Sequence, residues 1–316
     1  MNTVRLCGAI TGRGFNSGQR CQKKAYYCIN ENPTILRCGM HSRQFVEVAD
    51  AESTVLEPSL NPNPNDNNQS PLERQFELHA LGCATVATLN NLRQSPGIVC
   101  SYTLLKGDDR VPLNEGVINI FPNFQHHVRQ DGVCFPELSP ALLGPVVHGQ
   151  PGLPHAVNLE NFCRANEVFP CQLLDNGAVS QSFFETQWGL YTDPKVYPPA
   201  LEKPLFSLWR RMDTKELVRI SNGMSRRLFC HLYEQLVRAH PHFIQLQQML
   251  KDGVNICICG YTAYMVSPMY PIFNLEALLN DDHMPFGHEM VLFGMLTNQR
   301  PWTKAEPSAG PCAYIA

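Results

Sequence analysis

Hydrophobic positions recur at helical spacing in some parts of the chain and alternate with polar positions in others. In MSRRLFCHLYEQLVRA (224–239), Met224, Leu228, Leu232 and Leu236 recur every four residues, which predicts an amphipathic helix. Residues 73–92 and HFIQLQQMLKDG (242–253), which stops at Gly253, predict two more helices. GVINIF (116–121) and VNICICG (254–260) alternate as buried strands do. This order predicts an α+β or α/β fold with strands packed between helices.

A polar stretch, SLNPNPNDNNQSP (59–71), interrupts these patterns. Its Asn, Pro, Asp and Ser residues cannot bury enough apolar surface to hold a fixed conformation. We therefore expect a small N-terminal module (1–45), a disordered linker (46–71), one large domain (72–302) and a flexible tail (303–316).

The composition limits the kinds of partner. With 44% hydrophobic residues, 17% charged residues and a net charge of -3, the chain does not resemble a protein that coats nucleic acid by bulk charge. An apolar run approaching a membrane span and an N-terminal apolar leader are both missing from the sequence, so we expect a soluble intracellular protein without a membrane partner. Thirteen cysteines, an odd number, favour reduced thiols over a disulfide scaffold.

The N-terminal module carries a candidate metal site. Cys7, Cys21, Cys38 and His41 offer three thiolates and one imidazole, the ligand set of a closed structural Zn²⁺ site, and Cys28 could replace one of them. A segment this poor in large apolar side chains would depend on the metal for its folding free energy. Its basic residues could make a weak nucleic-acid contact, or could equally form a solvated face or a docking surface. These residues are Arg5, Arg13, Arg20, Lys23, Lys24, Arg37 and Arg43.

This segment is similar to the small zinc-binding segments that are common in plant, phage and large DNA virus proteins. The matching positions are Thr11, Gly18, Cys21, Ala25 and the final Cys38-Gly-Met-His41. The spacing after Cys21 is longer than in those segments, which keeps Cys28 open as a ligand.

A second candidate site precedes the apolar run in MPFGHEMVLFGML (284–296). Gly287, His288 and Glu289 stand where free backbone N–H groups of a helix carry partial positive charge, so a phosphate or sugar hydroxyl could dock there. Equally, Gly287 could serve close packing, Glu289 could complement the helix dipole and His288 could cap a loop. A zinc site that also used His283 would lack further ligands.

Two further charged residues have both a structural and a functional interpretation. Glu160 could form a surface pair with Arg164 one helical turn later, or point into a pocket and act as an acid or base. Arg226 stands near a predicted helix start, where the dipole disfavours a cation unless an anion is close; it could bind phosphate or simply be solvated.

Several blocks of the large domain resemble a family found in large DNA viruses, phages and some eukaryotes. The blocks are LSPALLGPVVHG (138–149), NLENFCRANEVFPCQL (158–173), FFETQWGLYTDP (183–194), EKPLFSLW (202–209), SRRLFCHLYEQL (225–236) and PFGHEMVLFGML (285–296). That family is similar, in the order of its elements, to the NADAR superfamily of N-glycosidases. The resemblance covers about residues 138–302 and implies a NADAR-like fold and an N-glycosidase or ADP-ribosyl hydrolase. The implied substrates are nucleotide-sugar or ADP-ribosylated compounds, or riboflavin precursors, and no redox cofactor is implied.

The resemblance also implies roles for individual residues. Glu160 would be the carboxylate that stabilises an oxocarbenium-like state or activates water, and His288 or Glu289 would handle the second proton. Asn161 would orient a ribose hydroxyl and Trp209 would stack on the base or sugar. Arg226 and the helix N-terminus at Gly287 would hold phosphate.

Two departures from the family pattern keep a second function open. CICGYTAY (257–264) lacks the acidic residue expected beside Gly260 and Tyr261, and Phe162-Cys163 replaces Trp-Gln. The alternative is a non-catalytic viral binding or structural protein whose zinc module contacts nucleic acid or a protein partner. Convergence of Glu160, Arg226, His288 and Glu289 on one cavity would favour the enzyme.

Overall fold

The computed structural model describes residues 27–29, 32–37, 71–105, 109–126, 128–195, 203–266 and 274–303. The chain divides into two compact units, Met1–Asn67 and Asn68–Ala316, which we describe separately. In the first unit, β1 (Tyr27–Ile29) pairs antiparallel with β2 (Asn32–Arg37). The expected zinc ligands Cys7, Cys21, Cys38 and His41 lie outside the described residues, so the zinc site stays a prediction.

The second unit is built on a parallel sheet. Its strands are β3 (Val99–Thr103), β4 (Val117–Phe121), β5 (Val133–Cys134) and β9 (Asn255–Gly260), in the order β3-β9-β4-β5, and every neighbouring pair is parallel. Because successive side chains of a strand point to opposite faces, Ile256 and Ile258 join the main core while Cys257 and Cys259 join a smaller cluster. The apolar alternation predicted for β9 is therefore that of a central strand buried on both faces.

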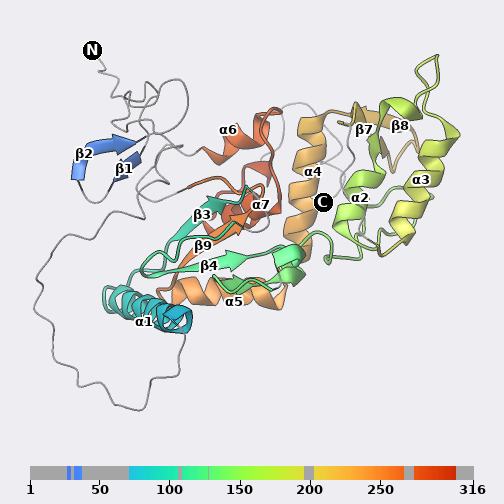
Figure 1. Cartoon of the computed structure of the whole chain (residues 1–316). Coiled ribbons are helices and arrows are strands. Elements are labelled where there is room, and N and C mark those ends of the chain that lie inside the picture. The colour runs from blue at the N-terminus through green and yellow to red at the C-terminus, as the bar shows by residue number, and fades with distance from the viewer. Residues whose placement is uncertain are drawn as a thin grey trace, which may run out of the picture. The chain divides into compact units, whose positions relative to one another are not determined.

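A second, smaller sheet is antiparallel. It contains β6 (Glu167–Val168), β7 (Phe206–Arg210) and β8 (Leu217–Ile220) in the order β6-β7-β8. Helices α2 (Leu159–Ala165) and α3 (Gln181–Thr192) lie next to this sheet (Figure 1). Phe183 of α3 packs with Val168 and Leu208 into a cluster of its own.

Helix α4 (Asn222–Val237) lies between the two sheets (Figure 1). It begins where the Ser221 hydroxyl accepts a hydrogen bond from the Met224 amide at 3.2 Å, an N-cap that agrees with the break expected before this helix. Leu228, Leu232 and Tyr233 are buried, and α4 contacts α7 (His288–Leu296) on one side and α2 and β7 on the other. The amphipathic helix α4 thus packs against two halves of the unit, one built on the parallel sheet and the other on the antiparallel sheet.

The remaining helices complete the unit around the parallel sheet. They are α1 (Pro71–Leu92), α5 (Pro241–Lys251) and α6 (Leu275–Asn280). Short 3-10 turns span Phe124–His126, Pro136–Leu138, Pro170–Gln172 and Pro301–Thr303. In the described parts of the chain, none of the helices combines the length and the apolar character needed to cross a bilayer.

Most expected elements and the coarse fold class are confirmed. The helices predicted over 73–92, 224–239 and 242–253 are α1, α4 and α5, and the two predicted strands are β4 and β9. The sequence left α+β and α/β both open. The structure combines the two, because a parallel sheet and a separate antiparallel sheet are both present. Residues 71–134 supply α1 and three of the four parallel strands.

A buried ion-pair network ties α4 to the end of the described chain. Glu234 is buried, and its Oε1 is 2.5 Å from Arg300 Nη1 and also contacts Arg238, while its Oε2 accepts from Trp302 Nε1 at 2.6 Å. Burial alone would raise the pKa of Glu234, but these hydrogen bonds outweigh it and hold the pKa below its ordinary value of 4.5.

We predict that Glu234→Gln destabilises the protein by about 3 kcal/mol at neutral pH, because the amide leaves buried cationic donors without their carboxylate. The lowered pKa means that this stabilisation is present above pH 4.5 and is lost as the pH falls through the native-state pKa. Urea unfolding followed by tryptophan fluorescence measures both effects.

The matched control is Arg238→Ala, because the Arg238 side chain is 63% exposed and its loss should cost less than about 1 kcal/mol. Equal losses for the two variants, or a Glu234→Gln loss that does not shrink in acid, would contradict this account.

Candidate functional site

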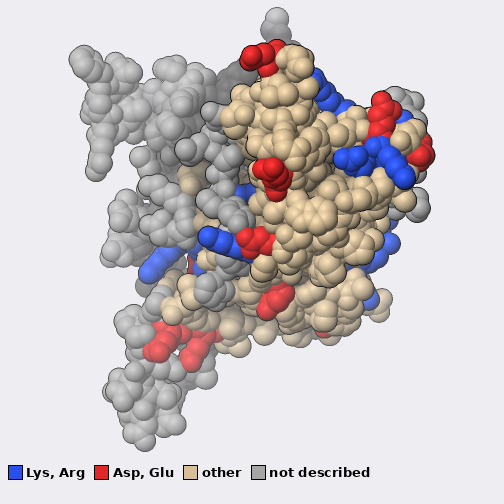
Figure 2. Space-filling view, turned by 90° about the vertical axis from the view of Figure 1, so that its right-hand side faces the viewer, with Lys and Arg blue, Asp and Glu red and all other residues tan. Residues whose placement is uncertain are grey.

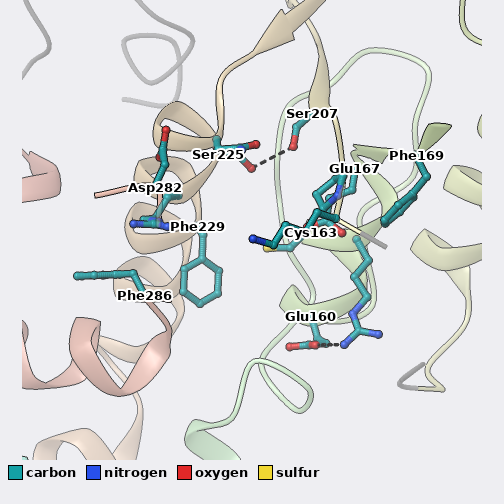
Figure 3. A pocket seen from close by; sticks show the side chains of 14 residues that line it. Glu160, Cys163, Glu167, Phe169, Ser207, Ser225, Phe229, Asp282 and Phe286 are labelled. Atoms are coloured by element: carbon teal, nitrogen blue, oxygen red, sulfur yellow. Dashed lines mark hydrogen bonds and ion pairs between the residues drawn. The ribbon is translucent and has the colours of Figure 1, made fainter. Parts of the chain in front are cut away.

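A cleft of about 530 Å³ opens between α4 and the antiparallel half of the unit. Figure 3 shows its two walls, with Phe229, Asp282 and Phe286 on one side and Cys163, Glu167 and Phe169 on the other. Three acidic side chains, three basic side chains and three phenylalanine rings line it. The full lining is Glu160, Cys163, Arg164, Glu167, Phe169, Lys203, Pro204, Ser207, Asn222, Ser225, Arg226, Phe229, Asp282 and Phe286.

The first wall is the face of α4 together with residues 282–286. Ser225, Arg226 and Phe229 lie within about one turn of α4, so they share a face of that helix. Ser207 of β7 donates a hydrogen bond to Ser225 at 3.2 Å, which joins the two walls at one end of the cleft (Figure 3).

The second wall is α2 and the strand that follows it. Helix α2 starts where the Asn158 side chain accepts from the Asn161 amide at 2.8 Å, which places Glu160 in its first turn. The helix ends at Ala165, and Glu167 enters β6 opposite Ser207 of β7. Directly paired residues of two strands project to the same face, which explains why Glu167 and Ser207 both reach the cleft.

The two carboxylates of this wall have different surroundings. Glu160 Oε1 lies 2.5 Å from Arg164 Nη2, so the expected pair one turn apart is present, and both side chains nevertheless line the cleft. Burial raises the pKa of Glu167 above its ordinary value of 4.5, the charge of Arg164 opposes the rise, and Glu160 adds to it. One carboxylate is therefore paired with a cation, while burial raises the pKa of the other.

The thiol on this wall is unsuited to act as a nucleophile. Burial, and then the carboxylates of Glu160 and Glu167, raise the pKa of Cys163 well above its ordinary value. Because the thiolate is the reactive form, Cys163 remains a protonated thiol near neutral pH.

Arg226 lies on the cleft but also holds a loop. Its guanidinium donates to the carbonyl oxygens of Leu279 at 3.2 Å, Asp281 at 2.9 Å and Met284 at 3.0 Å. A cation is well placed at this point, because the last carbonyls of α6 and the negative end of its dipole lie there. A phosphate bound at Arg226 would share a guanidinium that already positions the 281–284 segment.

Two other residues expected to bind substrate are buried away from the cleft. Asn161 has 0% exposure, and its Nδ2 donates to the carbonyls of Asp193 at 2.7 Å and Lys195 at 2.9 Å. Trp209 is 2% exposed and packs edge-on against Phe162, with ring centroids 6.2 Å apart. Both side chains support the walls of the cleft and do not line it.

His288 and Glu289 form a separate buried cluster at the start of α7. The Nδ1 of His288 lies 3.3 Å from Oε2 of Glu289, and its Nε2 lies 3.1 Å from the Pro122 carbonyl oxygen. Thr262 donates a hydrogen bond to the same carboxylate oxygen. The four residues whose convergence on one cavity would favour the enzyme therefore divide, with Glu160 and Arg226 on the cleft and His288 and Glu289 in this cluster, so that condition for the enzyme is not met.

Gly287 and Gly260 make room for this cluster. A Cβ at Gly287 would collide with the Thr262 hydroxyl, and a Cβ at Gly260 would collide with the Glu289 carboxylate. Because Gly287 has no side chain, the Thr262 hydroxyl can lie close to its Cα. This hydroxyl occupies the space beside Gly287 where a phosphate was expected.

His126 lies beside the same cluster, since the charges of His288 and Glu289 act on its ring. Its ring is 2% exposed, 5.1 Å from the Tyr261 ring centroid, and neither ring nitrogen has a hydrogen-bond partner among the described residues. Burial, and then the charge of Arg129, lower the pKa of His126. Within the described segments, no group of three or more His, Cys, Asp or Glu side chains is arranged to hold a metal ion.

Charge is dispersed on the face turned to the viewer in Figure 2. Among the described residues visible there, acidic and basic side chains lie singly or in small mixed groups and form no continuous basic area. Arg211 and Asp213, whose Nη2 and Oδ2 atoms are 2.8 Å apart, form a partly exposed ion pair.

Comparisons of the chain with protein-family models, curated proteins and solved structures give no match. What the cleft does must therefore be argued from its own residues. Of these, Glu167, Phe229 and Phe286 were missed by sequence reasoning. The helical spacing of Arg226 and Phe229 could have indicated Phe229, whereas Glu167 depends on the pairing of β6 with β7.

We predict a pH-dependent stability effect of Glu167→Gln. A raised native-state pKa stabilises the fold below pH 4.5, and this contribution is lost as the pH rises through the raised pKa. The stability of wild type relative to Glu167→Gln should therefore fall between acid and neutral pH, as measured by urea unfolding. Glu185→Gln, at an exposed position of α3, is the control and should show no such trend. A relative stability that rises with pH would show that Glu167 is not disfavoured as a carboxylate.

Proposed function

We propose that residues 71–303 form a hydrolase of N-glycosidic bonds that binds a phosphorylated N-glycoside of the ADP-ribose type in the cleft between α2 and α4. The observation that carries the proposal is the pair of glutamates on one wall, one beside an arginine and the other with a raised pKa. Pairs of carboxyl groups with opposed environments are the usual arrangement for acid and base roles in glycoside hydrolysis.

The shape and lining of the cleft suit such a ligand. Its volume of about 530 Å³ falls within the range of small-molecule sites. The rings of Phe169, Phe229 and Phe286 offer surfaces for a base, and Arg164 and Lys203 offer positive charge for phosphate. Hydroxyls of Ser207 and Ser225 could bind ribose oxygens.

In the proposed reaction, protonated Glu167 gives its proton to the leaving base as the bond between the base nitrogen and the sugar carbon breaks. The electron pair of that bond leaves with the base. Glu160 accepts a proton from a water molecule whose oxygen forms the new bond to the sugar carbon. His288 and Glu289, which do not line the cleft, take no part in this scheme.

We predict that Glu167→Gln and Glu160→Gln each lower the rate of base release by about 100-fold or more, the usual size of general acid or base catalysis. Mass spectrometry of the full chain incubated with ADP-ribosylated nucleoside, DNA and protein, and with riboflavin precursors, measures released base and sugar. Because the acid form of Glu167 is required, kcat/KM should fall as the pH rises through the raised pKa of Glu167.

Glu185→Gln serves again as the matched control and should keep wild-type turnover. Turnover by Glu167→Gln equal to wild type would remove Glu167 from the mechanism. A folded wild-type chain that releases nothing from the whole panel would favour the alternative, a non-catalytic binding protein.

A further inference from the structure

The imidazole of His126 is buried without a hydrogen-bond partner. His126 ends the 3-10 turn that follows β4, and neither ring nitrogen reaches a polar atom in the described segments. The buried ring of His148 differs, because its Nε2 donates to the Pro154 carbonyl oxygen at 2.8 Å and its Nδ1 accepts from the Gln150 amide at 3.1 Å. Buried polar groups are nearly always paired, so an unpaired one is kept mainly where it has a role.

Aromatic rings and a thiol surround His126. The centroid of the Phe121 ring, in β4, lies 5.7 Å from that of His126, and the centroid of the Tyr261 ring, which follows β9, lies 5.1 Å from it. Cys134 of β5 donates its thiol hydrogen to the His126 carbonyl oxygen at 2.9 Å. The backbone of the turn is thus bonded, while ring contacts that suit a neutral imidazole hold the side chain.

Charged groups face His126 from two sides. From its own segment come Arg129 and Asp131, whose Nε and Oδ1 atoms are 2.9 Å apart. From α7 come His288 and Glu289, whose Nδ1 and Oε2 atoms are 3.3 Å apart. Each carboxylate therefore already has a partner. Burial, and then the charge of Arg129, outweigh the two carboxylates and lower the pKa of His126 below its ordinary value of 6.5.

The turn that carries His126 is joined to the start of α7. Nε2 of His288 donates to the Pro122 carbonyl oxygen at 3.1 Å, which holds the 122–126 turn against that helix. Phe286, just before this end of α7, lines the cleft. A movement of the turn therefore reaches one wall of the cleft.

We propose that His126 is an acid-sensitive latch, whose protonation releases the 122–126 turn from Tyr261 and α7 and whose deprotonation lets the turn dock again. A proton on the ring adds a buried cation beside Arg129 and His288, with no carboxylate left to pair with it. Release exposes the ring to water, which solvates the charge. The latch does not depend on what the cleft binds.

The direction of the pH effect follows from the proton affinities of the closed and open forms. In the open form the pKa of His126 returns to its ordinary value of 6.5, whereas in the closed form it is lower. The closed form is therefore fully favoured above pH 6.5 and loses stability as the pH falls from 6.5 toward the lowered pKa. One linked proton changes the ratio of closed to open forms by at most about tenfold per pH unit.

Hydrogen–deuterium exchange of the full chain, measured by mass spectrometry at about pH 7.5, 6.5 and 5.5, tests the latch. After correction for the intrinsic pH dependence of amide exchange, protection of peptides covering 122–134 and 286–290 should fall by up to about tenfold per unit below about pH 6.5. Peptides of α3 should keep their protection, which separates local release from global unfolding.

His126→Phe keeps an aromatic ring against Phe121 and Tyr261 but cannot take up a proton, so its protection should not change with pH. His155→Phe, at an exposed position, is the matched control and should behave as the wild type does. Wild-type protection that does not fall in acid overturns the proposal, as does an equal fall in His126→Phe.

The wild type alone supplies a second measurement. The ¹⁵N resonances of the His126 ring should report protonation over the same pH range in which protection is lost. A ring that becomes protonated while the 122–134 peptides stay protected would show that no latch opens.

Discussion

The packing of α4 between two sheets is the constraint on which the rest of the second unit depends. Leu228 and Leu232 are buried, and the Tyr233 hydroxyl donates to the Leu138 carbonyl oxygen at 2.8 Å. The helix contacts α7 and α6 on the parallel-sheet side and α2 and β7 on the other. Because one amphipathic helix serves both halves, its orientation sets the distance between them. The contacts of Glu234 with Arg300 and Trp302, which lie outside α4, then fix that orientation at the end of the helix.

The cleft follows from this arrangement. Where α4 separates from α2, the two walls diverge, and the polar side chains near its N-terminal end face the carboxylates of α2 and β6 (Figure 3). Arg226 stabilises the first wall through the carbonyls at the end of α6, and Asn161 stabilises the second through the carbonyls of Asp193 and Lys195. Residues that hold backbone in this way keep a site preorganised without contacting its ligand. Asn161 therefore supports the site from behind, whereas Arg226 lines the cleft and also holds its wall.

Local patterns predicted most of the elements, and long-range pairing decided most of the site. The alternation in β9 and the four-residue repeat in α4 are properties of short segments, so they could be read directly from the sequence. The helical pattern around Glu160 gave no sign that it would end at Ala165, since Glu167 and Val168 become a strand by pairing with Ser207 and Phe206. Arg226 could be selected because it stands near a helix start, and Glu160 was selected through the family resemblance. Their separation from His288 and Glu289 depends on which side of α4 each element packs, which the sequence does not encode locally.

The proposed function requires that an ADP-ribose-type ligand binds in the cleft between α2 and α4. Amide resonances of the ¹⁵N-labelled full chain, titrated with ADP-ribose, test it most directly. We expect saturable shift changes at residues of both walls, including Cys163, Glu167, Phe229 and Phe286. Shift changes confined to the His288 and Glu289 cluster, or none at saturating ADP-ribose, would contradict it.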